Sequence, residues 1–293
     1  WQCKLPQNQI IDVTVPGCWD SYTPLKNIAT AVVFTRNVLI EKQNDKRYFL
    51  YFGGVSYYCD VFVNGSKVGS HEGMWDRFRF DVTDSIVDGN NEITLEIIKP
   101  GYESDDPFPV REVLSGFIPD VLCTFGGIWD DVWLEICDTC LIVSHYAKGD
   151  MSGRGQIKIT VDFFKDCNAG ILVDIYSPEG EKAGCLSIPS TEVKAGQKNF
   201  VLDFTVNNVL LWDTRNPNLY KYVATIVCDG LSKTVERQFG FREISYDGPK
   251  LLLNGTPIYL RGILHWGCYD EMIIPNPSRD VIQEEINKCR QFG

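Results

Sequence analysis

The sequence predicts an all-β fold, in which two β-sandwich domains lead into a C-terminal strand and helix that begin an α/β domain. Three observations predict it. Short alternating runs separated by turn signals recur through residues 1–243, a long irregular stretch interrupts the first half, and one amphipathic pattern closes the chain. The length of 293 residues suits two domains, and a 44% hydrophobic composition can supply a core for each.

Residues 1–138 are predicted to form the first β domain. In VFVNGSKVG, the pair Asn64-Gly65 between two strand-like runs indicates a tight hairpin. In NEITLEIIKP, apolar and polar residues alternate, which predicts a strand with one buried face. Between Lys99 and Gly126 the sequence is rich in Pro, Asp and Ser. A long irregular loop on a β scaffold is often functional, so this loop is a candidate site.

Residues 139–243 are predicted to form a second, smaller sandwich. QIKITVDF at 156–163 alternates without a break, and several further runs follow at the spacing of short strands. About 100 residues with roughly seven strands is the size of an immunoglobulin-like sandwich. The Cys–Trp–Cys spacing of antibody domains is missing from the sequence, so no disulfide-pinned version is expected.

Residues 244–293 change in character. An apolar strand is predicted over PIYLRGIL at 257–264, and a helix over 278–292 with Ser278 as its N-cap. Ile282, Ile286 and Cys289 follow at helical spacing on one face. A strand and a helix make half of a βαβ unit, which needs a second parallel strand. We therefore expect the chain to be the front part of a larger protein.

Charge and apolar patterning exclude some classes of function. The formal net charge is −11 and no basic stripe is present, which argues against a nucleic-acid partner. No apolar run approaches the roughly 20 residues of a membrane span. The first ten residues show no signal-peptide pattern. A cytoplasmic location is expected, with secreted or periplasmic as the alternative.

The cysteines and tryptophans favour structural roles. The eleven cysteines are scattered, several at inward positions of strands, which predicts mostly reduced, buried thiols. Cys137 and Cys140 form a lone CxxC without a second ligand pair, so no zinc site is expected. No metal and no cofactor are predicted. Trp19, Trp75, Trp129 and Trp133 suggest a carbohydrate-binding platform as one alternative. Large aromatic residues on strands usually belong to the core, and this is expected of all four.

Four stretches resemble glycoside hydrolase family 2, the family of β-galactosidases, β-glucuronidases and β-mannosidases. They are VTVPGCWD at 13–20, FGGIWDDVWLE at 125–135, LLWDTRNPNLYKY at 210–222, and FGFREI…LLLNGTPIYLRGILHWG within 239–267. The resemblance implies a jelly-roll-like sugar-binding domain (1–138), an immunoglobulin-like domain (139–243) and the start of a truncated (β/α)8 barrel (244–293).

The resemblance also implies retaining hydrolysis by two glutamates roughly 5 Å apart, an acid/base on the fourth barrel strand and a nucleophile on the seventh. Neither glutamate is expected in this chain, which ends after the first barrel helix. The one Asn-Glu dipeptide, Asn91-Glu92, opens a strand of the first domain and is not expected to be catalytic. No residue of this chain is therefore assigned a catalytic role.

Arg261, His265 and Trp266 are candidate substrate-binding residues. The resemblance places them at the C-terminal end of the first barrel strand, which faces the active site in barrel enzymes. Alternatively, Arg261 pairs with a carboxylate and Trp266 caps the barrel. Better-known relatives carry Asn-Arg-His-Glu or Asn-Lys-His-Glu where this chain has Leu-His-Trp-Gly. Galactosidase or glucuronidase specificity is therefore not assigned.

Asp105, Asp106 and Asp120 are further substrate-binding candidates in or beside the long loop. In some family members this region reaches the barrel mouth, and carboxylates accept hydrogen bonds from sugar hydroxyls. The alternative is a solvated acidic loop.

We expect the chain to be the N-terminal, non-catalytic part of a retaining β-glycosidase that acts on carbohydrate. Homo-oligomer formation is left open. The rival hypothesis is a non-catalytic carbohydrate-binding or scaffold protein of two β-sandwiches.

Overall fold

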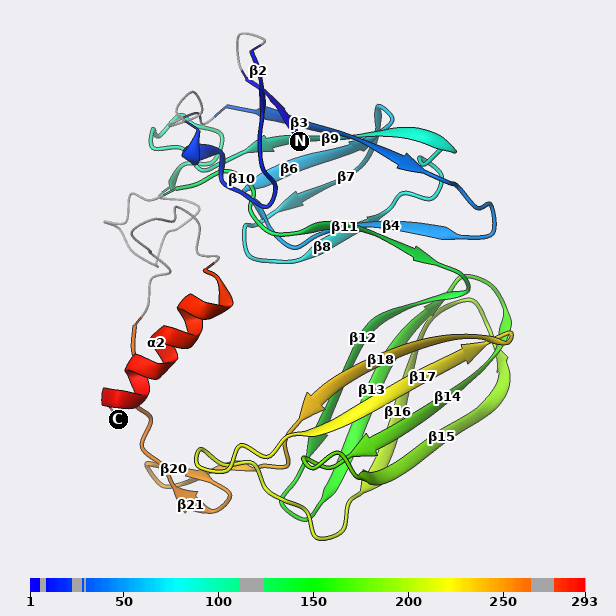
Figure 1. Cartoon of the computed structure of the whole chain (residues 1–293), viewed down its shortest axis with the longest axis vertical. Helices are drawn as coiled ribbons and strands as arrows, with labels where there is room; N and C mark the ends of the chain where they lie inside the picture. Colours follow the sequence, from blue (N-terminus) through cyan, green and yellow to red (C-terminus); the bar gives the residue numbers. More distant parts are fainter. Residues whose placement is uncertain (6–8, 23–27, 29, 111–123, 265–276, 293) are drawn as a thin grey trace. The chain divides into compact units, whose positions relative to one another are not determined.

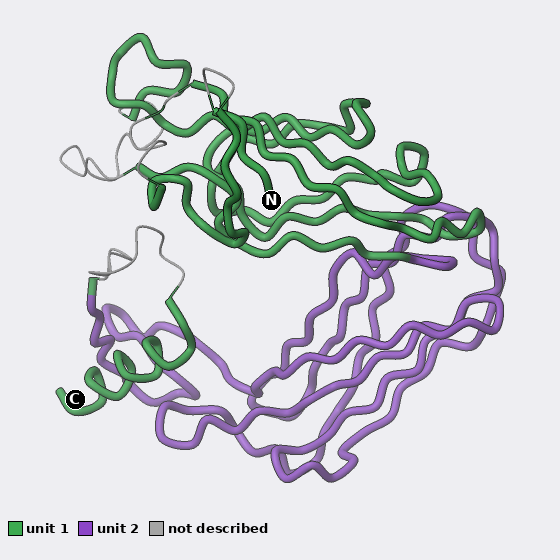
Figure 2. Tube along the Cα trace, turned by 45° about the horizontal axis from the view of Figure 1, so that its top comes forward, with its two compact units in different colours: residues 1–136, 264–293 green, residues 137–263 purple. Residues whose placement is uncertain are grey.

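The computed structural model describes residues 1–5, 9–22, 28, 30–110, 124–264 and 277–292 (Figure 1). The chain divides into two compact units (Figure 2): Trp1–Ile136 with Leu264–Gly293, and Cys137–Ile263. Strands dominate both units, as the sequence predicts. The domain boundaries at 138/139 and 243/244 stay a prediction, because a division by compactness does not by itself define folding domains.

Unit 1 is built on a six-stranded sheet in the order β2-β1-β3-β9-β6-β7. Its strands are β1 (Gln2–Lys4), β2 (Ile10–Asp12), β3 (Val32–Ile40), β6 (Tyr58–Val63), β7 (Ser66–Glu72) and β9 (Gly89–Ile98). A three-stranded sheet in the order β11-β4-β8 and a short β10-β5 pair complete the unit. Their strands are β4 (Arg47–Phe52), β5 (Val55–Ser56), β8 (Phe78–Asp81), β10 (Gly127–Ile128) and β11 (Val132–Cys137).

The core of unit 1 follows from strand alternation. On β9, Ile93, Leu95 and Ile97 are buried while the residues between them are more exposed, which confirms the predicted strand. The predicted hairpin between β6 and β7 is also confirmed. Asn64 and Gly65 both have positive φ, 51° and 77°, the conformation that a two-residue turn of this type requires.

Unit 2 is a β-sandwich, with one sheet in the order β12-β13-β16 and the other β15-β14-β17-β18. The strands are β12 (Cys140–Gly149), β13 (Arg154–Phe163), β14 (Cys167–Tyr176), β15 (Lys182–Val193), β16 (Gly196–Thr205), β17 (Tyr220–Cys228) and β18 (Leu231–Phe239). Ile157, Ile159, Val161 and Phe163 of β13 are all at most 1% exposed. The perfect alternation noted in the sequence therefore does build this core.

The end of the described chain differs in part from expectation. A small sheet forms from β19 (Ile244–Asp247), β20 (Lys250–Leu253) and β21 (Thr256–Pro257), and helix α2 spans Arg279–Phe292. Ser278 Oγ accepts a hydrogen bond from Val281 N–H at 3.4 Å, which confirms the predicted N-cap. The strand predicted over 257–264 is wrong from residue 258 onward. After one hydrogen bond from Ile258 N–H to Leu251 O, at 2.9 Å, the segment joins no described sheet.

The cysteine prediction is confirmed where it can be checked. All nine cysteines among the described residues are free thiols, and only Cys185 and Cys289 are exposed. Within the same part of the chain, no group of side chains has the arrangement of a metal site. In the described ranges we also find no helix with the length and apolarity needed to cross a bilayer.

The core prediction for the tryptophans is confirmed for Trp19, which is 1% exposed, and wrong for Trp75, which is 58% exposed. Trp75 lies in the turn between β7 and β8 rather than on a strand, so no second sheet covers it. Trp129 and Trp133 are half-buried.

The exposed C-terminal segment leads to a prediction on local stability. Ile263 and Leu264 are 69% and 76% exposed, and α2 buries no residue. Amides of 258–264 and of α2 should therefore exchange with deuterium on the order of a hundredfold faster than those of β13, because few buried contacts oppose local opening. Mass-spectrometric exchange at two protein concentrations tests this and controls for self-association. Equal protection of α2 and β13 at both concentrations would contradict it.

Candidate functional site

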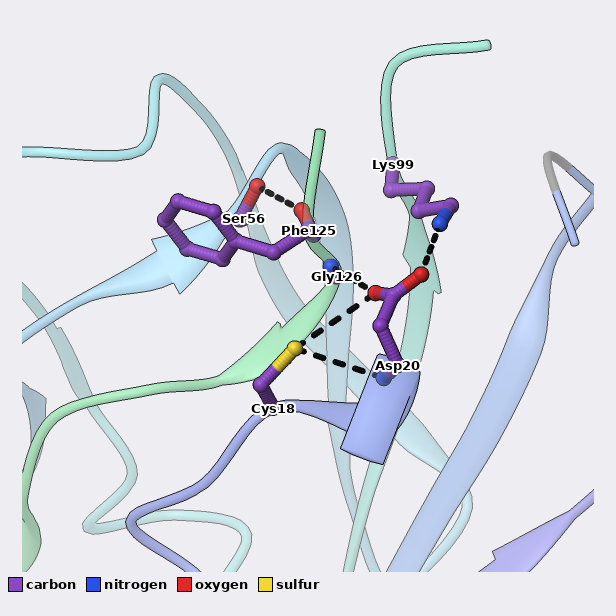
Figure 3. A network of polar contacts seen from close by, with 6 residues as sticks. All are labelled: Cys18, Asp20, Ser56, Lys99, Phe125 and Gly126. Carbon is purple, nitrogen blue, oxygen red and sulfur yellow. Dashed lines mark hydrogen bonds and ion pairs between the residues drawn. The ribbon is translucent and has the colours of Figure 1, made fainter. Parts of the chain in front are cut away.

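The candidate site is the long loop of unit 1, which leaves β9 at Lys99 and returns to β10 at Gly126. Both ends of this loop meet the same side chain, the carboxylate of Asp20 (Figure 3). Asp20 lies in a short 3-10 turn, Trp19–Ser21, far from either loop end in sequence. The loop is therefore closed at its base by a contact that only the folded chain can make.

The carboxylate of Asp20 is shared among three donors. One oxygen pairs with Lys99 Nζ, and the other accepts hydrogen bonds from Gly126 N–H at 2.9 Å and from Cys18 Sγ at 3.5 Å. The side chains of Lys99 and Asp20 are 1% and 9% exposed. Buried charges are tolerated only when they are paired and hydrogen-bonded, and here both conditions hold. We call Asp20, Lys99 and Gly126 the loop clasp.

Burial also fixes the protonation of the neighbouring thiol. Burial, and after it the charge of the nearby Asp20 carboxylate, raises the pKa of Cys18 to about 12. Cys18 therefore keeps its proton at neutral pH and donates it to Asp20. Ser56, also buried, donates from Oγ to the carbonyl of Phe125 at 2.6 Å, which holds the returning end of the loop from a second side (Figure 3).

The clasp brings together the two sequence segments 13–20 and 125–135. Trp19 N–H donates to the carbonyl of Gly126 at 2.9 Å, and Gly17 N–H donates to that of Ile128 at 2.9 Å. A Cβ atom at Gly126 would collide with the Trp19 indole, so glycine is required there. The two motifs are thus the two sides of one packed junction.

The described part of the loop forms its own tight turn. Gly101 N–H donates to Phe108 O and Val110 N–H to Gly101 O, each at 2.9 Å. The carboxylate of Asp106 accepts a hydrogen bond from Glu103 N–H at 2.9 Å. Asp106 therefore shapes the turn, whereas Asp105, like Glu103, is exposed and presents its carboxylate to solvent.

An aromatic cluster lies beside the clasp. Trp75 meets Phe125 and Trp129 edge-on, with ring centroids 6.0 and 5.5 Å apart. The Trp129 indole N–H donates to the carbonyl of Met74 at 2.7 Å, which holds the turn that carries Trp75. Exposed indole faces suit the apolar side of a pyranose ring. From its sequence, Trp75 is expected in the core, although Gly73 before it signals a turn.

Two further pairs of aromatic rings attach the loop to the scaffold. Phe108 packs against the rings of Tyr57 and Tyr58, with centroids 5.3 and 5.5 Å away. The Tyr57 hydroxyl donates to Glu72 at 3.0 Å. Burial and this hydrogen bond raise the pKa of Tyr57, so its hydroxyl stays a donor near neutral pH.

Unit 1 also contains a hollow between its sheets, with a volume of about 270 Å³. Trp1, Arg36, Asp131 and Trp133 contribute aromatic and charged groups to its wall. Aliphatic side chains of β3, β4, β9 and β11 form the rest together with residues 15–16. Such a mixture of rings and charged groups is compatible with a small polar ligand that has one apolar face.

The structure places the predicted site residues in different ways. Asp105 and Asp106 lie together on the loop, and Arg261 is exposed in unit 2 beyond β21. Asp120, His265 and Trp266 lie outside the described residues. The clasp residues Asp20 and Lys99 were not predicted, since a sequence pattern does not indicate which distant charges are buried as a pair.

Two family models match the chain. One, described as glycosyl hydrolase 2 galactose-binding domain-like, matches residues 24–129, and one for glycosyl hydrolases family 2 matches residues 142–242. A β-galactosidase of Thermoanaerobacter pseudethanolicus is 30% identical over 229 residues, which are 76% of this chain and 30% of that protein. A putative β-glucuronidase of Formosa agariphila is 28% identical over 227 residues, 75% of this chain and 26% of that protein.

Solved structures share the fold. A β-glucuronidase of Bacteroides uniformis aligns with a TM-score of 0.76 at 22% identity, over 97% of this chain and 35% of that one. A family 2 β-galacturonidase of Eisenbergiella tayi aligns with a TM-score of 0.78 at 19% identity, over 98% and 49%. The chain spans about a third or less of the curated relatives named above. With both of its β units matched in order, the chain belongs to glycoside hydrolase family 2.

Proposed function

We propose that this chain is the N-terminal, non-catalytic part of a retaining β-glycosidase that hydrolyses O-glycosidic bonds in β-linked carbohydrates. The observation that carries the proposal is the ordered match of both β units to family 2 domains. The names of the relatives, β-galactosidases and β-glucuronidases, support the reaction class. No particular sugar is proposed, because Leu-His-Trp-Gly at 264–267 departs from the residues of the better-known relatives.

In this proposal the chain supports a catalytic barrel and contributes to its substrate site. The clasp holds the loop so that the exposed carboxylate of Asp105 can accept hydrogen bonds from sugar hydroxyls. Asp106 acts through the turn that it caps. Asp120, Arg261, His265 and Trp266 complete the proposed set of substrate-binding residues. We place the two catalytic glutamates in the part of the longer protein beyond this chain.

The second candidate function is a non-catalytic carbohydrate-binding protein. The exposed indole of Trp75 and the hollow beside Arg36 and Asp131 are the observations that favour it. Under this hypothesis the chain binds saccharides on its own. Under the glycosidase hypothesis its exposed C-terminal segment is needed to build a barrel.

We further propose that the protein resides in a reducing, cytoplasmic compartment, which the free thiols support.

The glycosidase proposal predicts activity for the longer protein and none for this chain alone. Both should be incubated with nitrophenyl β-glycosides, including galactosides, glucuronides, galacturonides and mannosides. The longer protein should release nitrophenol from at least one of them. The chain should release none, because it would lack both the acid/base and the nucleophile. Turnover by the chain that survives a mock-purification control, or an inert longer protein that is folded, would refute the proposal.

The clasp predicts a stability cost for breaking one buried pair. Lys99→Met leaves the Asp20 charge buried and should lower the free energy of unfolding by about 3–5 kcal/mol. The matched control is Lys67→Met, which breaks the more exposed Lys67–Asp60 pair, 2.8 Å apart, and should leave the free energy of unfolding nearly unchanged. Adding Asp20→Asn to Lys99→Met should recover part of the loss.

Urea unfolding measures these differences, and hydrogen exchange over 101–110 reports the loop directly. In the longer protein, Lys99→Met should also lower kcat/KM because the loop is no longer held at both ends. Equal costs for Lys99→Met and Lys67→Met would show that the clasp does not hold the loop.

His265 and Trp266 are predicted to serve the substrate site rather than the fold. In the longer protein, His265→Ala should lower kcat/KM by roughly ten- to a thousand-fold, on the order of 1.4–4 kcal/mol of transition-state binding. Its melting temperature should stay within a few degrees. Trp266→Ala should behave similarly. Variants that melt far earlier while the folded fraction keeps normal kinetics would assign both residues to the barrel core.

A further inference from the structure

A concave site lies in unit 2 where β12 turns into β13, and the proposed function makes no use of it. Its volume is about 390 Å³, within the range of roughly 300–1,000 Å³ that is typical of small-ligand pockets. Residues 148–150, residues 154–156 and Arg242 form its wall. Three of these seven residues are cations, although the whole chain has a formal net charge of −11. We call this site the cationic pocket.

The backbone at Arg242 is fixed against the end of β12. Arg242 N–H donates to the carbonyl of Gly149 at 3.3 Å, and Phe241 forms a bridge with the same glycine. On its other side, the carbonyl of Phe241 accepts a hydrogen bond from Trp212 N–H at 2.9 Å. A Cβ atom at Gly149 would lie 2.3 Å from the Phe241 ring, so glycine allows this close approach. These contacts place Arg242 in the wall of the pocket.

The side chain of Arg242 is also oriented before any ligand arrives. Its guanidinium carbon lies 4.7 Å from the centre of the Trp212 indole. The carbonyl of Trp212 accepts a hydrogen bond from Asn254 Nδ2 at 3.0 Å, which holds the ring's own backbone. Stacking on a ring uses one face of a guanidinium and none of its N–H donors. A ligand would therefore meet a fork of donors whose ordering cost is already partly met.

Positive charge exceeds negative charge in the pocket. Among the described residues, no carboxylate forms an ion pair with Lys148 or Arg242. The one carboxylate of the wall, Asp150, is engaged in the turn between β12 and β13. One of its oxygens accepts hydrogen bonds from Ser152 N–H at 2.8 Å and from Ser152 Oγ at 2.6 Å. The other lies 3.4 Å from Arg154 Nε. Lys148 and Arg242 thus remain available to an anion.

The strand register places the pocket at one end of the β12-β13-β16 sheet. Lys148 lies opposite Gln156, and Gln156 lies opposite Asp203. Gln156 Nε2 donates to Asp203 Oδ1 at 2.9 Å, so this neighbouring carboxylate already has a partner. Lys158 follows two residues later on the same face, opposite Tyr146, and is not part of the pocket wall. Lys158 therefore offers a matched control.

We propose that the cationic pocket binds an oxyanion group, a carboxylate or a phosphate, of a small ligand such as an acidic sugar. The fork of Arg242 suits two parallel hydrogen bonds to two oxygens of one group, and Lys148 adds a compact positive charge. The turn contacts use only Nε of Arg154, so its terminal nitrogens add further donors to the wall. The proposal concerns unit 2 and stands or falls independently of the glycosidase function proposed above.

Calorimetric titration of the chain tests the proposal. The probes are galacturonate, glucose 6-phosphate and inorganic phosphate, with uncharged glucose as the control. At about 0.1 M salt, charges more than about 10 Å apart are largely screened. At least one of the three anions should bind with a Kd of roughly 1 mM or tighter, and glucose should not. Binding of galacturonate alone assigns a carboxylate ligand, and binding of the phosphates alone assigns a phosphate ligand.

Substitutions locate the binding. Arg242→Gln should weaken it by roughly tenfold or more, because hydrogen bonds to a charged group are lost. Arg242→Lys should weaken it nearly as much, since lysine keeps the charge but lacks the planar fork. Lys148→Gln should weaken binding by roughly threefold or more, whereas Lys158→Gln should change it by less than about twofold. Equal losses for Lys148→Gln and Lys158→Gln would overturn the proposal, because diffuse charge would then explain the binding.

A second measurement needs no substitution. Phenylglyoxal modifies accessible arginines, and mass spectrometry of the unsubstituted chain reports each site. A bound anion should protect Arg242 and leave Arg36, which is exposed in unit 1, unprotected. Failure of all three anions to bind, or equal protection of both arginines, would overturn the proposal. Binding by the chain but not by the longer protein would also overturn it, because the rest of the protein would then cover the pocket.

Discussion

The buried carboxylate of Asp20 is the interaction on which the candidate site depends. It takes a charged hydrogen bond from Lys99 and a backbone hydrogen bond from Gly126, so it joins the two ends of the loop to a third segment of the chain. A charge in this position is stable only while each partner is present. The base of the loop is therefore held in one position, and the turn that carries Asp105 and Asp106 follows directly after it.

Each β unit has its own buried core, and both cores form in the same way. In each, strands with alternating apolar residues place one face in a core, as β9 does in unit 1 and β13 in unit 2. The buried polar residues Ser56, Asn91 and Lys99 have hydrogen-bond partners, whereas the hydroxyl of Thr124 has none among the described residues. Lys99 pairs with Asp20 in the first unit. In the second, the buried cysteines Cys140, Cys167 and Cys228 contribute small, weakly polar groups that pack as hydrophobes.

Both β units match family 2 domains. The described residues also include an exposed apolar C-terminal segment and a group of polar and aromatic residues on unit 1. Exposed apolar residues at 258–264 and on α2 are costly for a chain in water and suit packing against further structure. The clasp, the loop and the Trp75 cluster gather polar and aromatic groups on one unit. Together they support a scaffold that also contributes to sugar recognition, as proposed above.

The sequence by itself determined the elements whose signals are local. Alternation identified β9 and β13, Asn64-Gly65 identified the hairpin, and Ser278 identified the start of α2, because each signal involves neighbours in the chain. The tertiary structure alone decided the pairing of Asp20 with Lys99, the exposure of Trp75, and the irregular backbone of 258–264. Burial and strand pairing depend on residues distant in sequence, and one sequence does not reveal which distant residues meet.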